Sequence, residues 1–155
     1  MKTLQLLIIS TLTIIILGNC GKSSGQYKIV LCSEVNKQGG CDESYTRTTF
    51  SNSSTMYIEI RNPNQLTNKM MILAFYDKNN KNEWNTVDTT DINIYKIFEQ
   101  RGMKIKKDQY PQWFTLNPIK ISDIVESGTK EGEFKLELID PSNKNVLGST
   151  KFVVK

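Results

Sequence analysis

The 155-residue sequence contains no histidine, and this absence limits the chemistry available to the chain. A serine or cysteine nucleophile that needs an imidazole base has no partner here, so general-base work would fall to carboxylates or lysines. The P-loop and G-x-G-x-x-G motifs are also absent. The acidic residues are scattered and mostly alternate with apolar positions, as they do on the solvated face of a strand. We therefore expect a protein without enzymatic activity and without a cofactor.

Neither sign of charge dominates the sequence. It holds 20 Lys and Arg residues against 16 Asp and Glu residues, for a formal net charge of +4. This mild basic bias falls short of the charge density of nucleic-acid-binding proteins, so we expect no nucleic-acid partner. Long hydrophobic runs are equally scarce. The apolar run Leu4–Leu17 is shorter than the roughly 20 residues that a transmembrane helix needs.

The N-terminal apolar run instead has the organisation of a secretory signal peptide. Met1-Lys2 supplies a positive charge ahead of Leu4–Leu17, and the run ends at Leu17-Gly18-Asn19-Cys20. A polar stretch rich in glycine and serine follows, over Gly21–Gln26. This order of a charge, an apolar run and small residues predicts that the chain is exported.

The motif Leu17-Gly18-Asn19-Cys20 resembles the lipobox of bacterial lipoproteins, and asparagine before the cysteine is similar to the leptospiral variants found in spirochaetes. The resemblance implies cleavage before Cys20, diacylglycerol on its sulfur, and a fatty acid such as palmitate on its new amine. In enterobacteria an aspartate after this cysteine retains a lipoprotein in the inner membrane, so Gly21 favours the outer membrane, on either its surface or its periplasmic face. The implied organisation is a signal peptide over 1–19, a lipidated cysteine and flexible tether over 20–26, and one domain over 27–155.

Only three cysteines occur in the sequence. With Cys20 taken by lipid, Cys32 and Cys41 remain as a pair in an exported chain, a pattern typical of a disulfide. The intervening Gln38-Gly39-Gly40 is a turn signal that could return the chain on itself. Two thiols without histidine fall short of the four ligands of a tetrahedral metal site, and a redox motif normally has the closer C-x-x-C spacing. We predict a structural disulfide and no metal site.

The patterning after residue 26 is mainly that of β-strands. The clearest element is a terminal hairpin, in which Phe134, Leu136 and Leu138 alternate with charged residues before a turn at 140–143. Residues 78–84 form an asparagine-rich turn signal, after which we expect the chain to return as a partner strand. Residues 121–132 suit a loop or one helical turn. The other predicted strands cover 26–32, 55–61, 69–77 and 111–116.

Seven to nine short strands with turn signals every 8–12 residues or so favour an all-β fold, a single antiparallel β-sandwich. The pattern Gly132-x-Phe134-x-Leu136-x-Leu138, followed after the turn by Gly148-x-x-x-Phe152-x-Val154, is similar to the last hairpin of immunoglobulin-like and fibronectin-type modules. That resemblance covers the last quarter of the chain and implies an immunoglobulin-like sandwich.

Residues 91–103 have two interpretations. They suit a helix with Asp91 as N-cap and Gly102 as the C-terminal stop. They equally suit two strands, over 92–98 and 103–105, that turn at Arg101-Gly102. Because strands surround this segment, we favour the hairpin.

Residues 101–114 are a first candidate for binding a partner. Their basic groups run into aromatic residues, a combination that suits sulfated polysaccharide, anionic lipid headgroups or an acidic protein. Charge runs more often mark a solvated face, in which case the lysines lie in water while Trp113 and Phe114 pack in the core. The candidate patch consists of Arg101, Lys104, Lys106, Lys107, Tyr110 and Trp113.

Lys155 is a second candidate, because a C-terminal lysine presents an ammonium and a carboxylate in the arrangement that kringle domains recognise. The resemblance to surface lipoproteins implies host plasminogen as its partner. We therefore expect a membrane-anchored, non-enzymatic lipoprotein whose sandwich is an interaction module for a host extracellular protein or polysaccharide. The alternative is a periplasm-facing structural or assembly component of the cell envelope.

Overall fold

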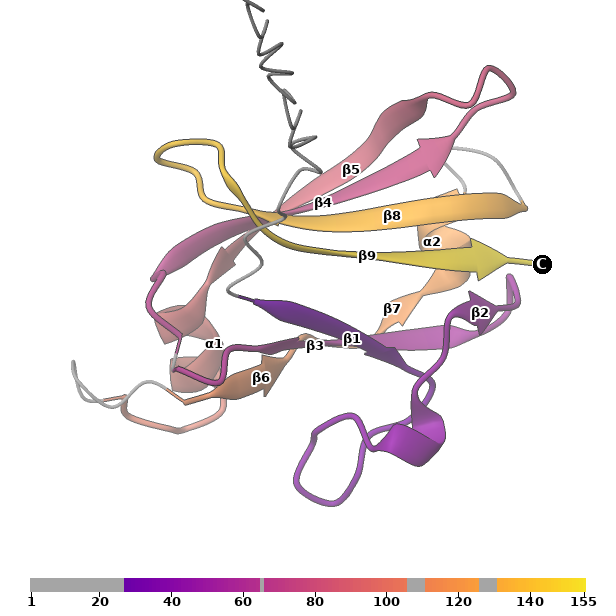
Figure 1. Ribbon diagram of the computed structural model, residues 1–155. Helices are drawn as coiled ribbons and strands as arrows, with labels where there is room; N and C mark the ends of the chain where they lie inside the picture. Colours follow the sequence, from indigo (N-terminus) through magenta and orange to yellow (C-terminus); the bar gives the residue numbers. More distant parts are fainter. Residues whose placement is uncertain (1–26, 65, 106–110, 126–130) are drawn as a thin grey trace, which may run out of the picture.

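The computed structural model describes residues 27–64, 66–105, 111–125 and 131–155. They form two β-sheets that face each other in two layers (Figure 1). The strands are β1 (Lys28–Cys32), β2 (Thr49–Phe50), β3 (Thr55–Arg61), β4 (Met70–Lys78), β5 (Trp84–Asn93), β6 (Trp113–Thr115), β7 (Ile119–Lys120), β8 (Gly132–Ile139) and β9 (Val146–Val154). The short helical elements are the 3₁₀ turn η1 (Glu43–Tyr45) and the helices α1 (Ile94–Gln100) and α2 (Ile121–Val125).

The smaller sheet has the order β1-β3-β6, with β7 also paired to β3, and the larger sheet has the order β2-β9-β8-β4-β5. The expected all-β sandwich is confirmed. Strand pairs in the described ranges are antiparallel except for the two-residue β2, which lies parallel to the end of β9. There the chain crosses from the smaller sheet to the free edge of β9 before it enters β3.

The core lies between the two sheets, where alternate side chains of each strand point inward. Met56, Ile58 and Ile60 of β3 are completely buried on this inner side. The predicted terminal hairpin is confirmed, since β8 and β9 pair in antiparallel register and Phe134 stacks on Phe152 with ring centroids 5.2 Å apart. The predicted strand over 55–61 also coincides with β3.

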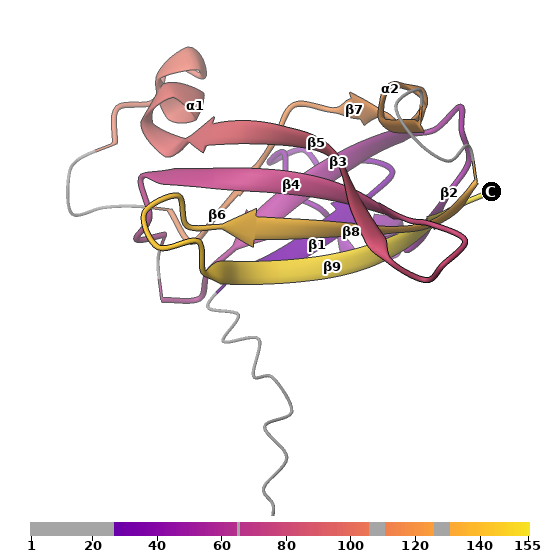
Figure 2. The same ribbon diagram turned by 90° about the horizontal axis from the view of Figure 1, so that it is seen from above.

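The two long sides of the sandwich differ. On one side β1 lies against β9, where the Tyr27 amide donates to the Leu147 carbonyl over 3.1 Å. Gly148 permits this approach, because a Cβ there would collide with the carbonyl group of Tyr27. On the other side β5 forms a free edge, and Figure 2 shows α1, β7 and α2 along that side.

The favoured hairpin over 91–103 is wrong. β5 continues to Asn93, which pairs with Met70, the first residue of β4. Beyond that point β4 offers no further partner, so the chain leaves the sheet and Ile94–Gln100 forms α1. The hairpin prediction failed because β5 ends where its partner β4 begins, at Met70, which lies 23 residues before Asn93 in the chain.

The helix itself follows the local signals in the sequence. Its N-cap is Asn93, whose side chain accepts from the Lys96 amide over 3.2 Å, rather than the expected Asp91. Ile94 and Phe98 lie one turn apart and are both buried, which holds α1 against the end of the sandwich. Gly102 ends the helix as expected, with a φ of +71°.

The predicted disulfide between Cys32 and Cys41 is present, with a Cα–Cα distance of 5.7 Å. It closes a loop that folds back over the outer face of the smaller sheet. Under this loop Glu59 is 1% exposed; its carboxylate accepts from the Cys41 amide and pairs with Arg61. The Thr115 hydroxyl donates to the carbonyl of Gly39 over 2.6 Å. These contacts join the loop to β3 and β6.

Candidate functional site

Cys20, the predicted lipid attachment point, lies outside the described residues. The point at which the chain enters the sandwich is nonetheless well defined, because Tyr27 is 3% exposed. Its phenol oxygen accepts from the amides of Thr67 and Asn68, over 3.0 and 3.1 Å, and donates to the Asn68 side-chain oxygen over 2.9 Å. We call the end of the sandwich where Tyr27 enters the tether end.

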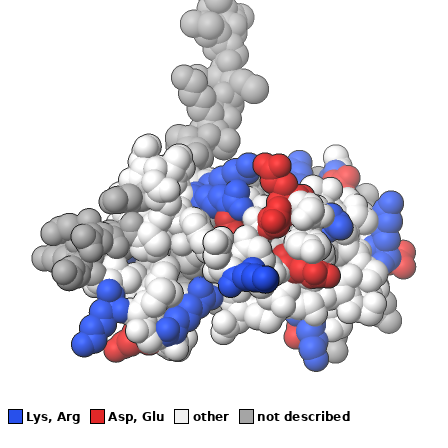
Figure 3. All heavy atoms as spheres, turned by 90° about the horizontal axis from the view of Figure 1, so that it is seen from below, with Lys and Arg blue, Asp and Glu red and all other residues white. Residues whose placement is uncertain are grey.

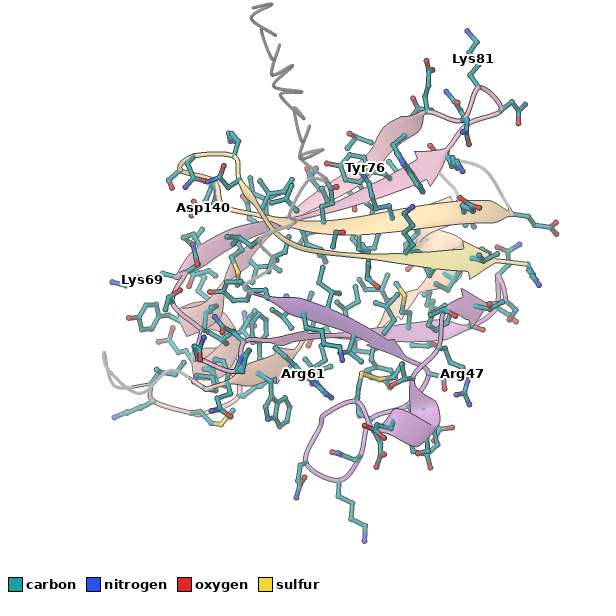
Figure 4. All side chains as sticks on the ribbon, viewed as in Figure 1. Arg47, Arg61, Lys69, Tyr76, Lys81 and Asp140 are labelled. Atoms are coloured by element: carbon teal, nitrogen blue, oxygen red, sulfur yellow. A yellow bond between two sulfur atoms is a disulfide. The ribbon has the colours of Figure 1, made fainter. Side chains whose placement is uncertain are left out.

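The tether end gathers the starts and ends of several strands. In the smaller sheet Lys28, Arg61 and Trp113 form one row across β1, β3 and β6. In the larger sheet β4 begins at this end with Met70, two residues after Asn68. Helix α1 closes the tether end between the two sheets (Figure 1). Lys69, just before β4, projects outward from this end of the sandwich (Figure 4).

Lys155 lies at the opposite end, which we call the far end. Its amide donates to the Phe50 carbonyl over 3.0 Å, and its side chain is exposed. Tyr27 lies beside Leu147. Lys155 follows Leu147 by eight residues along β9, which at a strand rise of about 3.4 Å per residue is a distance of roughly 27 Å. The chain therefore enters the sandwich at one end and leaves it at the other.

The predicted patch over 101–114 is only partly visible, since Lys106, Lys107 and Tyr110 lie outside the described residues. Arg101 donates to the Thr115 carbonyl, which joins the end of α1 to β6. Lys104 is exposed. Basic and acidic side chains are interspersed over the face that Figure 3 shows.

The two aromatic residues of that segment that the structure describes lie in different environments. Phe114 is buried and meets Phe98 edge to face, with ring centroids 6.2 Å apart. Trp113 is 37% exposed, and its ring lies so close to Gly40 that a Cβ there would be 3.2 Å from it. Only Phe114 is therefore a core residue, and Trp113 remains accessible beside the disulfide loop.

A cluster that the sequence did not reveal lies on the outer face of the larger sheet, and we call it the Trp84 surface. The Trp84 ring has three lysine ammonium groups near it, those of Lys78, Lys135 and Lys151, at 5.8, 5.2 and 5.5 Å from the ring centroid. Lys135 also lies 4.3 Å from the ring centroid of Tyr76. The lysines come from three strands far apart in the sequence, so no local pattern could have indicated the cluster.

Two glutamates accompany these lysines. Lys78 pairs with Glu133 over 2.9 Å, and Lys135 pairs with Glu137 over 2.8 Å. The hydrogen bond and positive charge of Lys78 lower the pKa of Glu133, whereas burial and the neighbouring Glu137 raise the pKa of Tyr76. Lys151 forms no ion pair with any described residue, although its charge also helps to lower the pKa of Glu133, so it is the least neutralised of the three ammonium groups.

A groove of about 660 Å³ lies on the open side of the sandwich, between β5, α1 and the segment 116–119. Ile92, Ile97 and Leu116 supply apolar lining, and Lys96 and Arg101 also contribute to it. No group of three or more histidine, cysteine or carboxylate residues in the described ranges could hold a metal ion. Within the same ranges no helix is long and apolar enough to cross a bilayer.

No family model matches the sequence, and no curated protein matches it. Among solved structures the chain is similar to an immunoglobulin-like protein from Pseudomonas aeruginosa, with 8% sequence identity and a TM-score of 0.42. The match covers 83% of this chain and 91% of the other.

Proposed function

We propose that this protein is a lipid-anchored lipoprotein of the cell envelope, held by Cys20, whose sandwich is a non-enzymatic interaction module. One observation carries the proposal: the chain enters at Tyr27 and ends at Lys155, at opposite ends of the sandwich. An anchor attached before Tyr27 would leave the far end directed away from the membrane. The disulfide between Cys32 and Cys41 supports an oxidising, exported location.

The partner in this proposal is a host extracellular protein or polysaccharide. The Trp84 surface supports an anionic partner such as a sulfated polysaccharide, because three ammonium groups surround one apolar ring. It lies toward the far end, since Trp84 pairs with Lys78 at the last position of β4. Lys155 is exposed at the same end and remains the proposed contact for plasminogen.

Labelling with radioactive palmitate tests the anchor. Wild-type protein should incorporate the label, and Cys20→Ala should not. Label that persists in Cys20→Ala, or a wild-type protein that takes up none, would refute lipidation at this residue. Protease treatment of intact cells then separates the two locations, because rapid loss indicates the outer surface and protection indicates the periplasm-facing alternative.

Binding to heparin tests the partner class. Lys151→Glu should weaken retention on heparin at moderate salt, while the matched change Lys120→Glu, in β7 of the other sheet, should leave it near the wild-type value. Equal retention of the two variants would exclude the Trp84 surface as the binding site. Deletion of Lys155 tests the second contact, since undiminished plasminogen capture would exclude that route.

A further inference from the structure

We propose that the tether end of the sandwich docks directly on the anionic headgroup layer of the membrane that holds Cys20. This inference rests on the proposed lipid anchor and adds a second, non-covalent contact with the bilayer. The contact surface, which we call the tether-end surface, is formed by the residues around the entry point and α1. It consists of Lys69, Met70, Tyr95, Lys96, Met103, Lys104 and Trp113.

Exposed apolar side chains concentrate at this end. Four large hydrophobic residues of the described chain are exposed: Tyr45, Met70, Met103 and Trp113, at 37, 42, 47 and 37%. Met70 begins β4, Trp113 begins β6, and Met103 follows α1, so three of the four belong to the tether end. Single exposed apolar residues are ordinary on a protein surface, but a group at one end suits an interface. Tryptophan and tyrosine in particular favour the headgroup region of a bilayer.

The charge of the tether-end surface complements an anionic bilayer. Lys69, Lys96 and Lys104 are exposed, and none of them forms an ion pair within the described part of the chain. Lys69 instead lies 5.7 Å from the ring centroid of Tyr95. Two carboxylates oppose only part of this charge: Glu99, which is exposed on α1, and Asp140, which accepts from the Asn68 side chain over 2.9 Å. Basic groups next to a membrane anchor are attracted by anionic lipid, and their aliphatic stems add apolar contact.

The length of the tether limits the orientations that the anchored sandwich can adopt. Seven peptide steps join Cys20 to Tyr27, and a fully extended chain covers at most about 25 Å over that length. The sandwich is roughly 27 Å from Tyr27 to the far end, by the strand rise along β9. The sandwich therefore cannot stand on its far end while Cys20 stays in the membrane, whereas it can stand on its tether end without stretching the chain.

The two tryptophans of the sequence serve as built-in probes, since Trp113 lies at the tether end and Trp84 lies toward the far end. The experiment reconstitutes the lipidated full chain into vesicles of phosphatidylcholine and phosphatidylglycerol that carry a headgroup-attached spin-label quencher. Trp84→Phe leaves only Trp113 fluorescent, and Trp113→Phe leaves only Trp84. We expect quenching of Trp113 to exceed that of Trp84 several-fold, and to decline in vesicles of phosphatidylcholine alone. Equal quenching of both probes would overturn the inference.

Charge reversal separates docking from anchoring. The triple variant Lys69→Glu, Lys96→Glu and Lys104→Glu should lose most of the Trp113 quenching yet still co-sediment with vesicles. A control with the same net charge changes exposed lysines of the far half instead: Lys81→Glu, Lys120→Glu and Lys155→Glu. It should keep wild-type quenching. Full quenching in the tether-end variant would refute docking while leaving the anchor intact, and a wild-type chain that fails to co-sediment would refute the anchor itself. Circular dichroism of both variants checks that the sandwich is folded.

Discussion

The close approach of β1 to β9 predicts a specific effect of Gly148→Ala. Gly148 is buried in β9. A Cβ at this position would overlap sterically with the carbonyl oxygen of Tyr27 and would lie 3.1 Å from its carbonyl carbon. The colliding atoms belong to the backbone, so no side-chain rotation can relieve the overlap. We expect the start of β1 to move away from β9, which would weaken the hydrogen bond from the Tyr27 amide to Leu147.

The size of this effect follows from two opposing terms. Overpacking of a buried site costs about 1–3 kcal/mol. Replacing glycine by alanine lowers the conformational entropy of the unfolded chain, which stabilises the folded state by about 0.4–1 kcal/mol. The expected net loss is about 1–2 kcal/mol in the free energy of unfolding, or about 4–7 °C in Tm for a domain of this size.

Urea denaturation monitored by circular dichroism measures the loss, with Ser149→Ala as a matched control because Ser149 is the exposed neighbour on the same strand. A double-mutant cycle with Tyr27→Phe tests the mechanism. If Gly148→Ala displaces Tyr27, the cost of removing its hydroxyl must shrink in the alanine background. Strictly additive costs, or a Gly148→Ala variant as stable as the control, would refute the argument.

Three further predictions follow from other parts of the sandwich. Replacing Cys32 and Cys41 together by alanine should lower the free energy of unfolding by about 2.7 kcal/mol in the chain-entropy model, measured by urea denaturation; a loss near zero would contradict it. Hydrogen bonds from the hydroxyl and amide of Ser142 lower the pKa of Asp140 below its usual 3.8. The Asp140 carboxylate therefore stabilises the folded state fully above about pH 3.8, and this stabilisation is lost as the pH falls through the lowered pKa. Asp140→Asn should therefore reduce the acid sensitivity of stability, and an unchanged acid transition would count against this. Phe134→Ala, in the centre of the core, should lower the free energy of unfolding by about 3–5 kcal/mol. A loss under about 1 kcal/mol would show that neighbouring side chains move to fill the cavity, contrary to this expectation.

The sequence predicted those parts of the fold whose signals are local. The strand over 55–61 has strict alternation of apolar residues, and the terminal hairpin adds a turn that fixes which residues pair. The disulfide followed from the number of cysteines in a chain that was expected to be exported. Each of these inferences needs only residues that are near one another in the sequence.

The features that sequence reasoning missed depend on contacts between distant segments. Whether residues after Asn93 continue as strand is decided by the start of β4, not by their own propensity. The Trp84 surface requires the register of β5, β4, β8 and β9, which brings Lys151 to a ring 67 positions earlier in the chain. The tether-end surface likewise unites residues at the starts of β4 and β6 with residues in and after α1. Candidate binding surfaces on a sandwich are products of strand order, and a single sequence does not specify that order.

The position of Tyr27 connects the fold to the proposed anchor. A domain held by its N-terminus transmits any pull from the membrane through the first residue that the fold secures. Tyr27 is joined to the larger sheet through Leu147 and to the connection before β4 through Thr67 and Asn68, and it continues directly into β1 of the smaller sheet. Such a pull would therefore be shared by both layers instead of peeling β1 from the smaller sheet. On this argument Tyr27→Ala should release the tether before it unfolds the sandwich. Early proteolytic clipping near β1 in an otherwise folded protein would reveal that release, and cleavage no faster than in the wild type would contradict it.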